Sequence, residues 1–442
     1  MAQPPFERNV PSIDAELGLG FYLTSTPGIG GKLRVLPEDF QVREDPASVA
    51  EAHGEGKYTL ATVQARNWET HRLMREIANR LGVNERRVFF SGSKDKRAVT
   101  VQNVAIPAPL ERVEQVSIPG VEILSTKRVD RAPKLGEHTG NAFTIRIREM
   151  DVPLDEAETS AREVASEILS AGGFPNFFGP QRFGSVRPVT HLVGKALVHE
   201  GPLEALWTYI AHPSELDPPR LAEPRAQLWE ERDPALALEV LPERLDYERQ
   251  LAGALAKHPD DPVQALDALP RNLQRMFVGA YQSYLFNLAL TERAKETAPW
   301  LAEEGDLLFP AEADGTPNKD ELVPVAALNA ERCKHATQKG DGFTTAALPG
   351  YEDVLAAGRQ GRIERSILEA EDVRPDDFRI YDAPHLSSSG TRRNMWCPIR
   401  KLDVSAGADD HGAFIELSFF LPKGSYATCL LREIMKAEIT AY

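Results

Sequence analysis

The sequence predicts an α+β fold whose body is interrupted by a largely helical insertion, and three observations lead to this prediction. Strand and helix signals alternate from Gly31 to about Gly173. From about Asn176 to Gly390 helical patterns and proline-broken loops dominate. Strand alternation then returns at Phe414–Leu421. A chain of 442 residues is long enough for two or three domains, and one body with an insertion fits this order better than two consecutive domains.

The first part of the chain begins with a helix and two strands. Leu73, Ile77 and Leu81 recur at helical spacing before Gly82, which predicts an amphipathic helix over residues 68–81. Apolar runs at 88–90 and 99–106 predict two strands, and the polar residues between them predict a connecting turn.

A longer strand and a second helix follow. Residues 141–148 alternate strictly, so Phe143, Ile145 and Ile147 share one face while Thr144, Arg146 and Arg148 share the other. An apolar stripe then predicts a helix that ends at Gly172 and Gly173; its residues are Ala161, Val164, Ala165, Ile168 and Leu169.

Three later segments have equally clear patterns. Residues 271–295 carry apolar and aromatic side chains at helical spacing and predict a long helix. Residues 414–421 predict a strand, and residues 427–438 predict a short closing helix.

Composition narrows the class of protein. Hydrophobic residues make up 42% and charged residues 26%, which excludes a wholly disordered chain. No run approaches the roughly 20 apolar residues of a membrane span, and the first residues lack the pattern of a secretory signal. The cysteines Cys333, Cys397 and Cys429 are far apart, so a disulfide framework or a cysteine-based zinc site is not expected. We expect a soluble, cytoplasmic protein that does not bind membranes.

The net charge of −15 argues against a general nucleic-acid binder, whose domains are usually basic. Net charge is an average, however, and a cationic groove can lie on an acidic body. Bases gather in three clusters, each of which could also be an ordinary solvated face: Arg86, Arg87, Lys94, Lys96 and Arg97; Lys127, Arg128, Arg131 and Lys134; and Arg392, Arg393, Arg400 and Lys401.

The turn between the two strands contains the densest group of reactive side chains. Asp95 lies among Lys94, Lys96 and Arg97, and neighbouring positive charge favours the ionised carboxylate. Such a carboxylate can act as a nucleophile or base, while the cations hold a phosphate backbone. The alternative is a solvent-exposed turn with a local ion pair, which composition alone slightly favours.

No other motif predicts a cofactor or a metal. The glycines at 28–31 are not followed by the Lys-Ser/Thr pair of a phosphate-binding loop. Cys333 and His335 are two potential ligands and do not make a metal site, and no histidines have HExxH spacing. We therefore expect neither a metal nor a cofactor.

Five motifs, in order along the chain, resemble the TruD family of tRNA pseudouridine synthases. They are LRVLPEDFQVRE at 33–44, SGSKDKRAVTVQ at 91–102, GNAF at 140–143, NFFGPQRFG at 176–184, and LPKGSYAT at 421–428 with LRE at 431–433. The resemblance runs from about residue 31 to the end of the chain.

The resemblance implies a fold, an activity and a partner. It implies a pseudouridine synthase core with a mixed sheet, made from residues 1–175 and 391–442, with the family's insertion domain at 176–390. It also implies an isomerase that converts uridine to pseudouridine in tRNA, at the uridine of position 13. This reaction oxidises nothing and needs no cofactor. No protein partner is predicted.

The resemblance also assigns roles to individual residues. Asp95 matches the family's catalytic aspartate. Five residues match or flank its substrate-binding positions: the aromatic Phe40 and Tyr426, the pocket amide Asn141, and the cations Arg34 and Lys94. Arg34 stands where a lysine is common, and Tyr426 stands where many members carry phenylalanine. Spacing alone would make Phe40 and Phe143 strand core, and the motif match reverses this reading only for Phe40.

We expect RNA to contact cations in two places: near the turn that carries Asp95, called the active turn below, and at the start of the insertion. Arg86, Arg87, Lys96 and Arg97 flank Asp95 along the chain. Gln181 and Arg182 belong to the motif that opens the insertion, and Arg187 follows it. For these three, an equally good interpretation is that they fasten the insertion to the core.

Two other functions remain possible at this stage. A non-catalytic RNA-binding or folding protein could use the same scaffold, although such a protein would not need Asp95. A hydrolase that uses Asp95 is a remote third possibility, because no second carboxylate or triad is visible.

Overall fold

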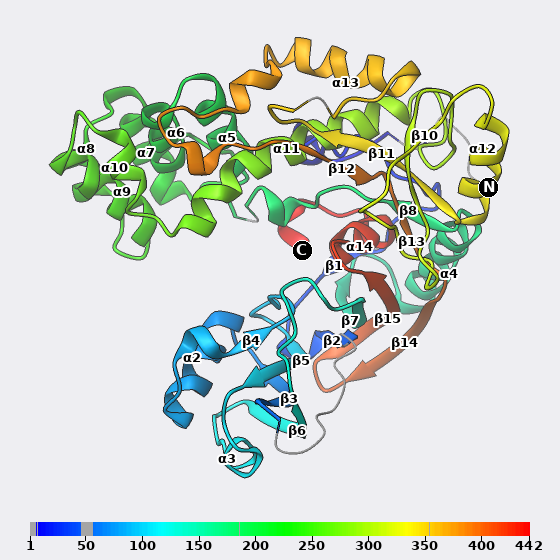
Figure 1. The fold of residues 1–442 in the computed structure, drawn as a ribbon, viewed down its shortest axis with the longest axis horizontal. Coiled ribbons are helices and arrows are strands. Elements are labelled where there is room, and N and C mark those ends of the chain that lie inside the picture. Colours follow the sequence, from blue (N-terminus) through cyan, green and yellow to red (C-terminus); the bar gives the residue numbers. More distant parts are fainter. Residues whose placement is uncertain (1–5, 7, 46–55, 185, 353) are drawn as a thin grey trace. The chain divides into compact units, whose positions relative to one another are not determined.

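The computed structural model describes residues 6, 8–45, 56–184, 186–352 and 354–442 (Figure 1). The chain forms two compact units. The first combines Thr24–Phe174 with Cys397–Tyr442, and the second combines the described part of Ala2–Leu23 with Pro175–Trp396. Part of the N-terminal stretch that bears on a secretory signal lies outside the described residues. Among the residues that the structure describes, no helix is both long and apolar enough to cross a bilayer.

The first unit is built around a mixed sheet. Its strands are β1 (Gly30–Lys32), β2 (Phe40–Asp45), β3 (Tyr58–Arg66), β4 (Phe89–Phe90), β5 (Val99–Ile106), β6 (Val121–Val129), β7 (Gly140–Met150), β14 (Leu402–Asp409) and β15 (Gly412–Pro422). Its helices are α2 (Thr70–Leu81), α3 (Leu110–Glu114), α4 (Leu154–Ser170) and α14 (Ala427–Met435), with short 3-10 turns η1 (Pro37–Asp39), η2 (Glu85–Arg87) and η6 (Ile439–Ala441).

The strand order is β14-β15-β7-β2-β5-β3-β6, with β1 added on β7 and β4 on β5. Strands from both ends of the described chain therefore enter one sheet, because β15 lies directly beside β7 (Figure 1). The β2–β5 pair is parallel, whereas the other strand pairs described in this sheet are antiparallel. The predicted mixed-sheet α+β core is confirmed.

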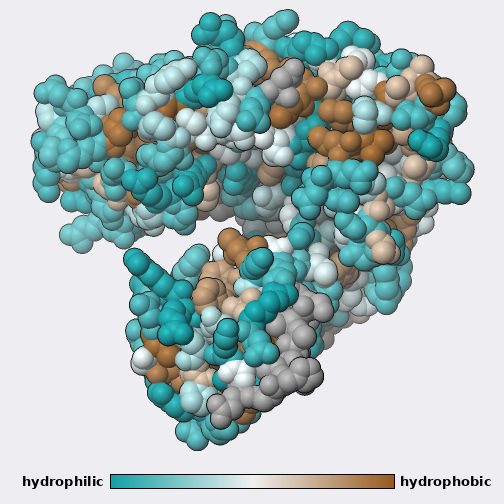
Figure 2. Space-filling view, in the orientation of Figure 1, coloured by the Kyte–Doolittle hydropathy of each residue, from teal (hydrophilic) through white to brown (hydrophobic). Residues whose placement is uncertain are grey.

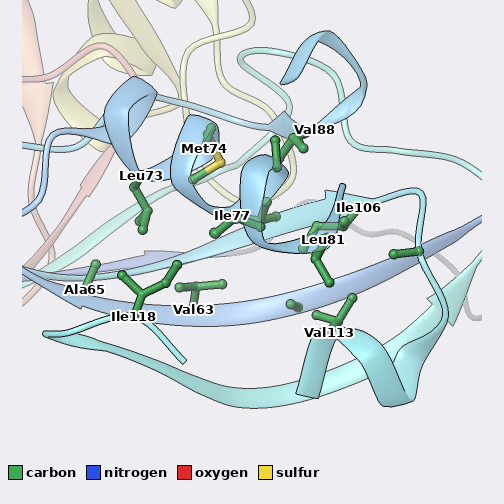
Figure 3. Close-up of a cluster of buried hydrophobic side chains, with 14 residues drawn as sticks. Val63, Ala65, Leu73, Met74, Ile77, Leu81, Val88, Ile106, Val113 and Ile118 are labelled. Atoms are coloured by element: carbon green, nitrogen blue, oxygen red, sulfur yellow. The ribbon is translucent and has the colours of Figure 1, made fainter. Parts of the chain in front are cut away.

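Helix α2 covers one side of this sheet, as the sequence pattern predicted. Its buried face carries Leu73, Ile77 and Leu81, which pack on Val63 and Ile106 of the sheet (Figure 3). The Glu69 carboxylate caps the first turn by accepting hydrogen bonds from two backbone amides. The helix ends at Gly82, whose φ of 65° is left-handed and suits glycine.

The second unit is mainly helical. Its helices are α1 (Ser12–Glu16), α5 (Thr190–His199), α6 (Pro202–Ala211), α7 (Pro219–Glu231), α8 (Pro234–Val240), α9 (Asp246–Lys257), α10 (Pro262–Leu266), α11 (Arg271–Arg293), α12 (Ala330–Lys339) and α13 (Gly358–Ala370), with 3-10 turns η3 (Pro180–Arg182), η4 (Pro375–Phe378) and η5 (Pro384–Leu386). A small sheet has the order β10 (Val323–Pro324), β9 (Leu307–Pro310), β11 (Gly342–Leu348) and β12 (Thr391–Asn394).

The remaining strands β8 (Gly173–Pro175) and β13 (Trp396–Pro398) lie where the chain passes from one unit to the other. Over helices α7 to α10 the visible surface is mainly hydrophilic, as expected for solvent-facing helices (Figure 2).

The start of the chain does not cluster with the unit that we expected for residues 1–175. The described residues before Thr24 belong to the second unit. Within that unit the Asn287 side-chain amide donates hydrogen bonds to the carbonyls of Leu17 and Phe178, both at 3.0 Å. These long-range bonds have no local sequence signal. The naming of the units as catalytic and insertion domains stays a proposal.

The predicted long helix and strand are confirmed at α11 and β15, whereas the closing helix is shorter than predicted. Helix α14 ends at Met435 because Lys436 adopts a left-handed φ of 45°. The chain then continues into a separate 3-10 turn.

Arg148 joins distant parts of the first unit through two ion pairs, of which the one with Asp39 is buried. Its Nε donates to Asp39 Oδ1 at 2.8 Å, and its Nη2 donates to Asp409 Oδ2 at 2.7 Å. The side chains of Arg148 and Asp39 are almost fully buried. Strand alternation predicted Arg148 on the face opposite the apolar residues, and its burial depends on these two distant carboxylates.

Replacing Arg148 with methionine should lower the free energy of unfolding by about 3–5 kcal/mol, because Asp39 would stay buried without its counterion. Denaturant unfolding monitored by circular dichroism measures this loss. The matched control is Arg162→Met, which breaks an exposed pair with Glu158 within one helix and should cost no more than about 0.5 kcal/mol. Equal losses in the two variants would contradict the assigned role of Arg148.

Candidate active site

The turn that carries Asp95 connects two neighbouring antiparallel strands of the first unit. Strands β4 and β5 pair through Phe89 and Ala105, and residues 91–98 link them. The Lys94 backbone amide donates to Thr70 Oγ1 at 2.8 Å, which ties the turn to the start of helix α2. The turn is therefore anchored immediately before Asp95.

Asp95 is exposed and pairs with a cation from another part of the chain. Its side chain is 57% exposed, and Oδ2 accepts a hydrogen bond from Arg34 Nη2 at 3.1 Å. Arg34 has a left-handed φ of 55°, which is uncommon for a residue other than glycine. Its other terminal nitrogen donates to the Tyr442 carbonyl at 3.3 Å. An accessible carboxylate beside a guanidinium is suited to act on a bound substrate.

Phe40 lies beneath Arg34. The guanidinium carbon is 4.0 Å from the Phe40 ring centroid, in cation–π geometry, and Phe40 is only 1% exposed. The ring also contacts Phe143 edge-on at 6.3 Å, and Phe143 stacks on Phe419 at 5.2 Å. The ring is therefore buried as ordinary strand core would be, contrary to the interpretation that the motif match favoured for Phe40. A base that stacks on Phe40 must first displace the Arg34 guanidinium.

Lys94 is buried, unlike the aspartate that follows it. Its Nζ lies 2.7 Å from Glu44 Oε2, and the two side chains are 4% and 0% exposed. The same ammonium donates to the Gly92 carbonyl at 3.3 Å. Lys94 therefore has little surface to offer to a substrate. No local pattern indicates its pairing with Glu44, which is fifty residues away.

Asn141 has an unused acceptor in the same part of the sheet. It lies in β7, opposite Glu44 of β2 on one side and Leu421 of β15 on the other. Directly opposed residues of neighbouring strands share a face, so the side chains of Asn141 and Glu44 lie on the same face of the sheet. Among the described residues, the buried Oδ1 of Asn141 has no hydrogen-bond partner. A ligand with an N–H group would satisfy it, once neighbouring side chains move to expose the oxygen.

Tyr426 reaches this region from the other end of the chain. It is half-buried and forms the N-cap of helix α14, five residues beyond the Leu421 that pairs with Asn141. The register of β7 and β15 thus brings the predicted aromatic and amide positions into one unit, although they are far apart in sequence.

The cations predicted to flank the site are exposed to solvent. Arg86 and Arg87 form the exposed turn η2, and Lys96 and Arg97 are exposed in the turn with Asp95. Arg97 also donates to the Val35 carbonyl at 3.2 Å. These four side chains are accessible to a polyanion.

The candidates at the start of the second unit have structural contacts. Gln181 is exposed, whereas Arg182 donates from Nε to Ser283 Oγ at 3.1 Å. Arg187 donates to the Tyr209 carbonyl at 2.7 Å, and burial lowers the pKa of its guanidinium to about 10. Both of these hydrogen bonds lie within the second unit, so the two arginines fasten that unit internally.

The interpretation of the third basic cluster as a solvated face is wrong for Arg392 and Arg393, whereas Arg400 and Lys401 are exposed. Arg392 pairs with Glu364 at 2.9 Å, and both side chains are almost fully buried. Arg393 lies 4.2 Å from the Phe178 ring centroid and donates to Asn176 Oδ1 at 2.7 Å. Their partners are distant in sequence, so a local run of bases could not reveal them.

Sequence reasoning also missed His138, which lies beside the active turn. A Cβ added to Gly92 would be 3.0 Å from the His138 Cε1. Burial and the nearby Lys94 charge lower the pKa of this imidazole. Within the described residues no group of three or more His, Cys, Asp or Glu side chains is arranged to hold a metal.

Comparison with known proteins gives a consistent result. The family model of tRNA pseudouridine synthase D (TruD) matches residues 16–434. A relative from Methanococcoides burtonii, named "Probable tRNA pseudouridine synthase D", is 37% identical over 97% of this chain and 98% of its own. One of the same name from Natronomonas pharaonis is 37% identical over 96% and 98%. A crystal structure from Methanosarcina mazei, described as TruD, superposes with a TM-score of 0.83 at 36% identity and covers 98% of this chain and 100% of its own.

The burial of Phe40 predicts a large effect on stability. Phe40→Ala should lower the free energy of unfolding by about 3–5 kcal/mol, as truncation of a core phenylalanine usually does. Denaturant unfolding measures this change, and Phe419→Ala on the same face is the matched core control. If the free energy of unfolding fell by less than about 1 kcal/mol, the Phe40 ring would not be part of the core.

Proposed function

Because the chain belongs to the TruD family of tRNA pseudouridine synthases, which are isomerases, we propose that it acts on the uridine at position 13 of tRNA and that Asp95 is its catalytic carboxylate. One observation carries the assignment of the site. Asp95 is exposed, and the neighbouring Lys94 forms an ion pair with Glu44. Glu44 in turn lies opposite Asn141 in the sheet, and the side-chain oxygen of Asn141 has no hydrogen-bond partner among the described residues.

The chemistry requires a carboxylate and a pocket for the detached base. The bond between the ribose and uracil N1 breaks, the uracil turns, and a bond forms to uracil C5. The C5 proton is lost and N1 gains a proton, so the reaction balances within one nucleotide. The exposed carboxylate of Asp95 can attack the sugar or the base, or accept a proton.

Asn141 is suited to recognise uracil. The N3–H of uracil is a donor flanked by two carbonyl acceptors, and an amide side chain offers the complementary acceptor and donor. The unsatisfied Oδ1 of Asn141 would accept from N3–H, while its NH₂ group would donate to a carbonyl.

The uridine must leave its RNA fold before it can reach this site. Extruded bases usually stack on aromatic side chains. We assign this role to Tyr426, and to Phe40 after displacement of Arg34. Displacing the guanidinium gives up the partly exposed ion pair with Asp95, which contributes only about 0–1 kcal/mol, together with the cation–π contact to Phe40 and the hydrogen bond to the Tyr442 carbonyl.

Asp95→Asn separates an enzyme from a protein that only binds RNA. The variant should form no detectable pseudouridine, because an amide is a poor nucleophile and a poor base. Its stability should change by about 0–1 kcal/mol, since the Arg34–Asp95 pair is partly exposed. Thermal unfolding, tRNA affinity and pseudouridine yield, mapped by carbodiimide labelling and primer extension, should be measured on one preparation.

The possible outcomes differ clearly. Loss of turnover with intact folding and binding supports the assignment of Asp95. Wild-type turnover in the Asp95→Asn variant would contradict the assignment of Asp95 as the catalytic carboxylate. A wild-type protein that binds tRNA tightly but modifies no uridine would favour the binding-protein alternative.

The exposed cations near Asp95 predict salt-dependent RNA binding despite the net charge of −15. Log affinity for tRNA should fall linearly with log salt concentration, because phosphate neutralisation releases counterions. Replacing Arg86, Arg87 and Lys96 with glutamine should flatten the slope by roughly 0.7–0.9 for each phosphate that is no longer neutralised. Fluorescence anisotropy over a salt series measures it, and an unchanged slope in the triple variant would contradict this RNA path.

A further inference from the structure

We propose that Glu44 is a positioning residue for Asp95, acting through the buried ammonium of Lys94, and that Lys94 holds the active turn instead of contacting the substrate. The inference rests on the proposed function of Asp95. It assigns a role to a residue at the end of β2 that does not itself contact the reacting atoms.

The first argument is geometric. Glu44 Oε2 lies 2.7 Å from Lys94 Nζ, and Oε1 accepts a hydrogen bond from the backbone N–H of Asn103 at 3.4 Å. Lys94 Nζ also donates to the Gly92 carbonyl at 3.3 Å, and the Lys94 amide donates to Thr70. The residue just before Asp95 is therefore fixed by its side chain and by its backbone, which restricts where the Asp95 carboxylate can point.

The second argument is electrostatic. Both side chains are almost fully buried, so each charge needs the other. His138 is a second basic group near the pair, but burial and the Lys94 charge lower the pKa of its imidazole, which disfavours its charged form. Its ring lies so close to Gly92 that a side chain there would press against it. Lys94 is thus the cation that Glu44 holds.

The third argument concerns the register of the sheet. Glu44 of β2 lies directly opposite Asn141 of β7. The Glu44 carboxylate thus binds Lys94 in the turn that bears Asp95 and lies beside Asn141, whose side-chain oxygen has no hydrogen-bond partner among the described residues. Catalysis needs the carboxylate and the base in a fixed relation, and misplacement by about 1 Å can cost on the order of 100-fold in rate.

The experiment compares variants of the pair with a matched control. Glu44→Gln leaves Lys94 buried without a counterion, and Lys94→Met removes the ammonium alone. The double variant Glu44→Gln with Lys94→Met removes both charges, and such neutral replacements are often close to neutral for stability. Glu364→Gln is the control, because it breaks an equally buried Glu–Arg pair in the second unit. Thermal unfolding, tRNA Kd, kcat and KM are measured for each, beside wild type and Asp95→Asn.

The expected result is a change in kcat that stability does not explain. Glu44→Gln and the double variant should each lose on the order of 10- to 100-fold in kcat, with KM and Kd changed by less than about threefold. Glu364→Gln should lower the melting temperature while keeping kcat at assay temperatures where it is folded. If Glu44→Gln does not fold, the double variant carries the test.

Three results would overturn the inference. Wild-type kcat in a folded Glu44 variant would do so. So would recovery of both stability and kcat in the double variant, because the pair would then serve the fold alone. A Lys94→Met variant with raised KM and unchanged kcat would make Lys94 a substrate contact. Failure of the proposed function looks different, because wild type would then form no pseudouridine or Asp95→Asn would remain active.

Discussion

The buried guanidinium of Arg148 is the interaction on which the arrangement of the first unit depends. It holds Asp39, just before β2, and Asp409, at the end of β14, while itself belonging to β7. These three segments come from separate parts of the chain. A buried arginine tolerates its environment only if its partners are in place, so the ion pairs form only when the strands are correctly assembled. The same strand order places Glu44, Asn141 and Leu421 in one row.

The ability of this protein to bind a polyanion depends on where its charged side chains lie more than on its net charge. The chain carries a net charge of −15, yet the turn around Asp95 is locally cationic. Some of its bases are exposed, as at Arg86 and Lys96, whereas Lys94 is buried and neutralised. Counting bases along the sequence treats these groups alike. Only the folded structure separates cations that can meet a phosphate from those that hold the protein together.

Local patterns predicted some of the elements individually, whereas helices α5 to α10 and strands β9 to β11 were predicted only as part of a largely helical segment. Helix α2, strand β5 and helix α11 follow from the spacing of their apolar residues, and α2 also from its caps, because neighbouring residues determine these features. Motifs that resemble the TruD family pointed to Asp95 and Asn141. Local patterns could not show that Phe40 is covered by Arg34, or that Arg392 and Arg393 are buried. Each of these facts depends on a contact between distant residues, for which periodicity carries no signal.

Two cations beside Asp95, Arg34 in space and Lys94 along the chain, differ in a way that suits the proposed action on an extruded base. Arg34 is partly exposed, has a left-handed backbone and covers Phe40, so its ion pair with Asp95 is easier to exchange for a substrate than a fully buried pair would be. Lys94 is buried against Glu44, and separating that pair would leave an uncompensated charge, at a cost of about 3–5 kcal/mol. A base entering the site would therefore displace Arg34 and leave Lys94 in place. If Asp95 is the catalytic carboxylate that we propose, the turn would keep its position while the carboxylate is released to react, and such preorganisation favours catalysis.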